Sequence, residues 1–170
     1  MFAIRACPLP HQALLTRYAS AGAYTDCYAA DLARPVSHAQ YVEAFYTGAL
    51  FRIERLLLRL FLARPSTDAE VRQLAAGEAT RFAAWRVEDR AADQILMCDI
   101  AGRTRSWLMV APAPAGSTLY FGSAVVPVRR QPDAAGRSRM GFAFTTLLGF
   151  HKLYSRALLA SARSRLSRPA

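Results

Sequence analysis

The second half of the chain constrains the fold most. Several β-type runs occupy roughly residues 79–128, and one long amphipathic segment follows at about 140–166. An antiparallel sheet needs a cover over its apolar face, and a long helix with a wide apolar face can provide that cover. The pattern therefore predicts a helix packed on a sheet, with a space between them in which a small apolar molecule can bind.

Four segments in this half are rich in β-branched and aromatic residues, as strands are. They span 80–88, 94–100, 104–111 and 118–128, and turn residues separate them. The short link 101–103 predicts a hairpin turn with Gly102 in the left-handed conformation. Because connections of this length join antiparallel neighbours, we expect an antiparallel sheet.

The first half predicts a strand followed by three helices. The strand covers about 23–30. The first helix begins near His38 with Ser37 as its N-cap, the second covers 49–62, and the third covers 67–76 with Ser66 as its N-cap. Pro8 and Pro10 indicate that residues 1–21 are irregular or briefly helical. The order of strand, three helices, four strands and long helix predicts a single α+β domain over 1–170.

Composition excludes several classes of protein. With 170 residues, 53% hydrophobic and 20% charged, the chain is globular and not disordered. The net charge is +10, but the basic residues are spread along the chain and Lys152 is the only lysine, so we expect no nucleic-acid partner. Charges interrupt the most hydrophobic helix, and no signal peptide is evident, so we expect no transmembrane segment and a cytoplasmic location.

The three cysteines are an odd number without a C-x-x-C pair. This spacing indicates free thiols and neither a disulfide framework nor a zinc site. Cys27 and Cys98 fall inside strand-like runs, where a cysteine commonly serves as a small buried apolar residue.

Four motifs resemble one family. They are F-A-A-W-R-V-E at 82–88, G-R-T-R-S-W-L-M-V at 102–110, S-T-L-Y-F-G-S at 117–123 and L-G-F-H-K-L-Y-S-R-A-L-L at 148–159. The chain resembles the uncharacterised family named domain of unknown function 2867, within the START-like (SRPBCC) superfamily of helix-grip folds. The resemblance implies a curved antiparallel sheet wrapped on a long C-terminal helix, with a cavity between them. The family has no established catalytic residues to carry over to this chain.

His151 and Tyr154 are the first candidate pair. They lie three residues apart within the apolar arc of the last helix and are therefore neighbours on its surface. An imidazole and a phenol that face a cavity can orient a polar group of an apolar ligand or transfer a proton. Alternatively, both side chains are packed residues whose polar ends contact backbone or water.

Strand aromatics and the last helix supply the remaining cavity candidates. Aromatic side chains on a concave sheet can line a small-molecule cavity, and they can equally belong to an ordinary core. The candidate ligand-binding set is Trp85, Trp107, Tyr120, Leu147, His151, Tyr154 and Leu158.

Charged residues give two further interpretations. Glu88 and Asp99 lie on predicted strands, and Arg86, Arg103 and Arg105 are close enough in sequence to be their cross-strand partners. We therefore expect structural arginine–carboxylate pairs rather than an acid–base role for these two carboxylates.

The stripe Arg52, Arg55 and Arg59 on one helix face is either solvated or meets an anionic surface or an acidic partner.

Catalytic and cofactor signatures are absent from the sequence. There is no phosphate-binding glycine loop, no H-E-x-x-H and no G-x-S-x-G, and the three histidines are scattered. Ser106 and Ser123 have no evident His–Asp partners, so we predict no catalytic residues, no metal and no cofactor. The leading hypothesis is binding of a small hydrophobic molecule. An enzyme with cyclase- or isomerase-like proton transfer and a protein- or membrane-interaction module are the alternatives.

Overall fold

The structure, a computed structural model, describes residues 4–53, 66–126 and 142–168, and the side chains of the last helix from residue 151. The helices are α1 (Thr16–Ser20), α2 (His38–Tyr46), α4 (Asp68–Ala76) and α5 (Phe142–Leu166). The strands are β1 (Arg5–Ala6), β2 (Tyr24–Leu32), β3 (Arg81–Phe82), β4 (Trp85–Ala91), β5 (Gln94–Asp99), β6 (Thr104–Ala113) and β7 (Gly116–Val125).

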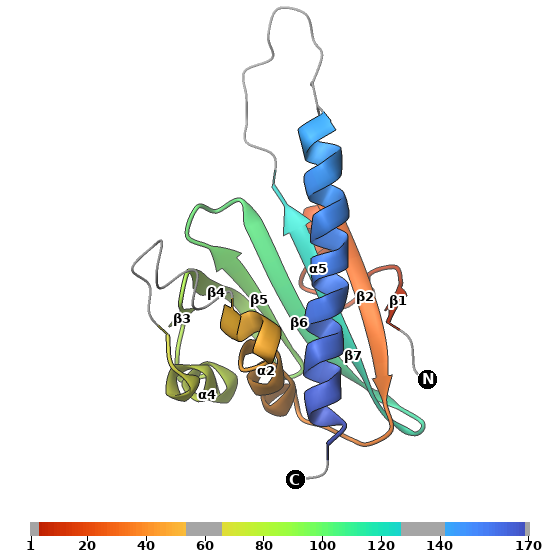
Figure 1. Cartoon of the computed structure of the whole chain (residues 1–170), viewed down its shortest axis with the longest axis vertical. Helices are drawn as coiled ribbons and strands as arrows, with labels where there is room; N and C mark the ends of the chain where they lie inside the picture. Colours follow the sequence, from red (N-terminus) through yellow and green to blue (C-terminus); the bar gives the residue numbers. More distant parts are fainter. Residues whose placement is uncertain (1–3, 54–65, 127–141, 169–170) are drawn as a thin grey trace, which may run out of the picture.

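The strands form one antiparallel sheet in the order β1-β2-β7-β6-β5-β4-β3. Strand β2 precedes α2, α4 and α5 in the chain, yet it pairs with the last strand, β7, from Tyr24↔Val125 to Leu32↔Ser117. Figure 1 shows α5 lying lengthwise across β2 and β7, with α2 beside it and α4 on the other side of α2. The α+β architecture, the antiparallel sheet and the helix that follows it are as the sequence predicts.

The main core lies between this helical layer and one face of the sheet. Alternate residues of each strand point to the same face, so Leu108 of β6 and Leu119 of β7 meet Tyr41 of α2 and Leu159 of α5 there. All four side chains are fully buried. At roughly 1.5–3 kcal/mol for each large apolar side chain removed from water, this contact fixes the helices on the sheet.

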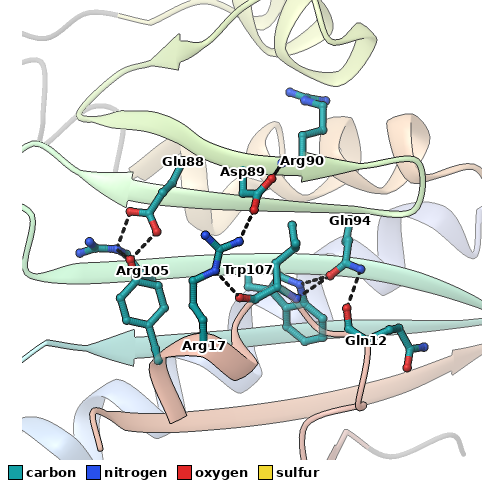
Figure 2. Close-up of polar contacts among 10 residues, drawn as sticks. Gln12, Arg17, Glu88, Asp89, Arg90, Gln94, Arg105 and Trp107 are labelled. Atoms are coloured by element: carbon teal, nitrogen blue, oxygen red, sulfur yellow. Dashed lines mark hydrogen bonds and ion pairs between the residues drawn. The ribbon is translucent and has the colours of Figure 1, made fainter. Parts of the chain in front are cut away.

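The opposite face of the sheet is also covered. The segment 7–20, which includes α1, packs on this face through a smaller core cluster formed by Ala13, Leu15, Cys27, Leu96, Trp107, Met109 and Ala124. Figure 2 shows the polar contacts that hold this segment: the side-chain amide of Gln94 donates to the Gln12 carbonyl and accepts from the Trp107 indole N–H. The expectation that residues 1–21 are irregular or briefly helical agrees with the short helix α1. It does not include β1 or the packing of this segment on the sheet, because a segment with two prolines and no apolar periodicity gives no local signal for either.

A buried ion pair lies on this second face. Arg105 Nε donates to Glu88 Oε2 at 2.9 Å and to the Tyr18 hydroxyl at 2.8 Å. The side chains of Arg105 and Glu88 are only 10% and 16% exposed. The predicted arginine–carboxylate pair is therefore confirmed for Glu88. It is wrong for Asp99, whose Oδ1 accepts the backbone N–H groups of Arg103 and Thr104 and so closes the β5–β6 turn.

Local geometry corrects two boundaries. The expected strand 80–88 is split into β3 and β4, because Ala83 adopts a φ of 51° and makes a tight turn. The cap of α4 is Thr67 and not Ser66, since only Thr67 stands three residues before a glutamate, Glu70, that completes a capping box.

Other local expectations are confirmed. Ser37 caps α2 with a capping box that includes Gln40. Gly102 has a φ of +70°, as the predicted hairpin turn requires.

The predicted helix 49–62 begins at residue 49, and its part beyond residue 53 lies outside the described residues, with Arg55 and Arg59. Arg52 forms an exposed ion pair with Asp68 at 2.7 Å. Among the described residues, no helix is long and apolar enough to cross a membrane.

Candidate ligand site between strand β2 and helix α5

A groove of about 570 Å³ lies between β2 and α5. Its lining combines apolar, aromatic and charged side chains, from Ala6, Cys7, Tyr24, Thr25, Asp26, Cys27, Tyr28, Lys152, Leu153 and Arg156. Leu153 is 68% exposed, which is unusual for a leucine in a protein of this size, and it lies on the wall that α5 contributes. The groove is therefore an open depression with an apolar side chain on one wall.

Asp26 connects the groove to the layer between sheet and helix. Strands β2 and β7 pair Asp26 with Ser123, so both side chains point to the face that α5 covers. The Ser123 hydroxyl donates to Asp26 Oδ1 at 2.6 Å, and the Ser123 backbone N–H donates to the same oxygen at 3.0 Å. The Asp26 side chain is only 8% exposed.

His151 of α5 completes the cluster. Its Nε2 lies 2.6 Å from Ser123 Oγ and 3.7 Å from Asp26 Oδ2. Because the serine proton goes to Asp26, Ser123 Oγ accepts the proton carried by Nε2, and the other ring nitrogen, Nδ1, takes no part in this contact. The His151 side chain is 28% exposed.

This cluster, Asp26–Ser123–His151, differs from a nucleophilic triad. In a triad the histidine stands between the carboxylate and the serine and removes the serine proton. Here Ser123 stands in the middle and gives its proton to Asp26, so its oxygen is not activated. The exposed member is His151, which can hold a polar group of a ligand or exchange a proton with it.

One acceptor of the cluster is unsatisfied. Asp26 Oδ2 is buried and has no hydrogen-bond partner in the part of the chain that the structure describes. Burial and Asp26 together raise the pKa of Tyr28 to about 12, so this phenol stays protonated at neutral pH. Burial also raises the pKa of Tyr24. Both tyrosines therefore present hydroxyl donors close to a buried carboxylate.

The structure divides the predicted cavity residues between the two faces of the sheet. His151 lies in the cluster, Leu158 is buried in the main core, and Tyr154 and Trp85 pack partly buried against that core. Trp107 is fully buried on the opposite face, together with Tyr120, which packs against the smaller cluster. The side chain of Leu147 lies outside the described residues. Trp107 and Tyr120 thus cannot line one cavity with His151.

Asp26 and Ser123 are the members that sequence reasoning missed. The expectation that Ser123 has no His–Asp partners is wrong, because Asp26 approaches it across a strand pair that joins residues 97 positions apart. No local signal reveals this register.

Metal binding finds no support in the described residues, which contain no group of three or more His, Cys, Asp and Glu side chains that could hold an ion. Comparison with protein-family models, with curated proteins and with solved structures finds no match to this chain. The chemistry of the groove and its cluster is thus the basis for assigning a function.

Proposed function

We propose that this protein is a helix-grip domain of the START-like kind that binds a small, mostly apolar molecule in the groove between β2 and α5. The strand order, in which the first long strand lies beside the last one and a long helix crosses both, supports the fold. The observation that carries the binding proposal is the groove itself, which lies between the sheet and the terminal helix.

The lining indicates what kind of molecule fits. Small-molecule sites are largely apolar and contain a few polar groups that orient the ligand. Leu153 and the rings of Tyr24 and Tyr28 provide contact area, while Asp26 provides a buried negative charge. Lys152 and Arg156 line the groove on the helix side. An apolar body with one hydrogen-bonding group matches this distribution.

Binding is tested with two measurements on the intact chain. Native mass spectrometry of freshly purified protein is expected to show a co-purified apolar species. Titration with the apolar dye 1-anilinonaphthalene-8-sulfonate then compares the parent chain with Leu153→Ala. Loss of most of one leucine side chain from the contact is expected to weaken dye binding by roughly 5- to 30-fold.

A matched control is available in Ile100. It is 59% exposed and is not among the groove residues. Ile100→Ala is expected to leave dye binding unchanged. Equal weakening by the two variants, or absence of any dye binding to the parent chain, contradicts the proposal.

A second function, acid–base catalysis in the same groove, is favoured by the Asp26–Ser123–His151 cluster. A partly exposed imidazole held by a buried carboxylate through a serine can accept a proton from a bound substrate. The probe 5-nitrobenzisoxazole opens its ring on proton removal alone and so reports base catalysis. Enzymatic function predicts a rate well above that of free imidazole at equal concentration, and loss of that excess in His151→Gln. A parent rate equal to that of free imidazole rules out this second function.

A further inference from the structure

Two cysteines lie side by side where the chain leaves β1. The Sγ atoms of Cys7 and Cys27 are 3.5 Å apart, and the Cys7 backbone N–H donates to the Cys27 carbonyl at 3.0 Å. Strands β1 and β2 pair Arg5 with Ala29 and Ala6 with Tyr28, so Cys7 continues the same register opposite Cys27. The two thiols are therefore fixed cross-strand neighbours.

This backbone spacing matches that of a disulfide. Hydrogen-bonded partners in an antiparallel pair have Cα atoms about 5.5 Å apart. Disulfides most often join Cα atoms about 5.5–6 Å apart, with a bond of roughly 2.05 Å between the sulfurs. Rotation of the two side chains is enough to close the remaining gap between the Sγ atoms, and no strand has to move.

We propose that Cys7 and Cys27 form a reversible disulfide by thiol–disulfide exchange with a small-molecule disulfide of the glutathione type. This inference is independent of the groove's ligand. It also gives a role to the only two cysteines of the chain that lie next to each other, since Cys98 is fully buried in β5 and its Sγ contacts the Asp99 carbonyl.

Exposure sets the order of the two steps. Both cysteines are among the groove residues, but Cys7 is half-buried whereas Cys27 is only 5% exposed. The Cys7 thiolate attacks one sulfur of oxidised glutathione, breaks its disulfide and releases one glutathione thiolate. Cys27 then attacks the Cys7 sulfur, loses its proton and releases the second glutathione. Two protein thiols and one glutathione disulfide become one protein disulfide and two glutathione thiols.

The environment of Cys27 fits its place as the second thiol. Burial, and then the neighbouring Cys7, raise the pKa of the Cys27 thiol, which makes Cys27 the poorer first attacker. Once Cys7 is in the mixed disulfide it carries no thiolate charge that opposes ionisation of Cys27.

Closing the bond connects two layers of the fold. The cysteines are 20 positions apart, and the loop between them carries α1 and the segment that covers the second face of the sheet. A disulfide that closes a loop of this length restricts the unfolded chain, and we expect the melting temperature to rise by about 5–10 °C.

The test uses the full chain in glutathione buffers of graded oxidised-to-reduced ratio, followed by acid quenching, alkylation and mass spectrometry of peptides. The expected result is a peptide pair joined through Cys7 and Cys27, with Cys98 alkylated, a higher melting temperature, and full reversal by dithiothreitol. Cys98→Ala, which also removes one thiol, is expected to form the same bond at the same ratio. Cys7→Ser and Cys27→Ser are expected to lose both the bond and the temperature shift.

Three results overturn the inference. The first is that all three thiols stay free at every ratio of oxidised to reduced glutathione at which the protein remains folded. The others are a stable glutathione adduct on Cys7 that Cys27 does not displace, and a disulfide that involves Cys98. Repeating the oxidation in denaturant separates fold from chemistry: the inference requires the preference for the Cys7–Cys27 pair to fall there to the modest excess that its shorter loop gives in an unfolded chain. Circular dichroism of Cys7→Ser and Cys27→Ser checks that loss of the bond does not follow from unfolding.

Discussion

His151 on helix α5 lies 2.6 Å from Ser123 on strand β7, and this contact is the polar link between the terminal helix and the sheet at the groove. One further turn along the helix, Arg156 donates to the Ile4 carbonyl. Closer to the helix end, Arg163 donates to the Asp31 carbonyl at 2.8 Å. Apolar packing alone is non-directional, so these bonds set where along the sheet the helix rests.

Ser123→Ala is predicted to reduce the free energy of unfolding by about 1–3 kcal/mol. The substitution removes a donor to Asp26 and leaves a buried carboxylate with fewer partners, which costs the desolvation of that group. Ser106→Ala is the control, because Ser106 is the cross-strand partner of Ser123, is nearly as buried, and shows no side-chain hydrogen bond among the described residues. Urea unfolding at neutral pH measures both, and equal losses would disprove the role given to Ser123.

Glu88→Gln is predicted to destabilise the protein by about 3 kcal/mol, since it leaves the guanidinium of Arg105 buried without its counter-charge. The double variant Glu88→Gln with Arg105→Leu is expected to lose less than the sum of the two single losses. Chemical denaturation of the four chains measures this coupling.

Asp89→Asn provides the comparison for that ion pair. Asp89 pairs with Arg17 on the same face, but the side chains are 38% and 45% exposed, respectively, so the loss is expected to stay below about 1 kcal/mol. Additive losses at Glu88 and Arg105, or a larger effect at Asp89, would contradict the burial argument.

The sequence predicted those parts of the fold that depend on local composition and turn residues. Enrichment in β-branched and aromatic residues indicated β5, β6 and β7, and turn chemistry located Gly102. The pairing of Glu88 with an arginine was also predictable, because strands joined by short turns are neighbours and a buried carboxylate needs a partner.

The cluster at the groove was not predictable in the same way. Asp26 and Ser123 meet through the β2–β7 register, which depends on how the whole sheet closes and not on any nearby residue. Trp107 shows a related problem. It is fully buried, but both faces of this sheet are covered, so burial alone does not reveal which face a residue joins.

Gly116→Ala is predicted to destabilise the protein by about 3 kcal/mol or more. Gly116 has a φ of +149°, and a Cβ atom there would lie 2.3 Å from the Leu32 carbonyl oxygen and 2.4 Å from the Arg34 nitrogen. Both atoms are backbone and cannot rotate away, so β2 and β7 would have to separate. Gly102→Ala tests backbone conformation alone, because Gly102 has a φ of +70° and no atom lies within 4 Å of the added Cβ. We expect it to reduce the free energy of unfolding by about 1 kcal/mol. Thermal melts that rank the two variants equally would refute the close-approach explanation.

His38 predicts a pH dependence of stability. It is 9% exposed, lies at the edge of a second pocket of about 280 Å³, and its Nε2 has no hydrogen-bond partner among the described residues. Burial, and then the positive charge of Arg90, lower the pKa of this imidazole from 6.5 to about 4, against the opposing effects of the Leu108 backbone and Asp93. The folded protein therefore keeps His38 neutral at a pH where the unfolded chain binds a proton.

The sign of the effect follows from that difference. Above about pH 6.5 neither state protonates His38, and its contribution to stability is fully present. As pH falls from 6.5 towards 4 the unfolded chain gains the proton first, so stability declines by up to about 3 kcal/mol. Carboxylates also titrate at about pH 4, so the comparison has to cancel their contribution. The quantity to follow is a difference at each pH: the free energy of unfolding of the parent chain minus that of His38→Gln. That difference should fall steadily across the window, whereas His11→Gln, at an exposed position, should track the parent chain throughout. A difference that stays constant with pH, or one that grows as pH falls, would show that His38 is not held neutral by the fold.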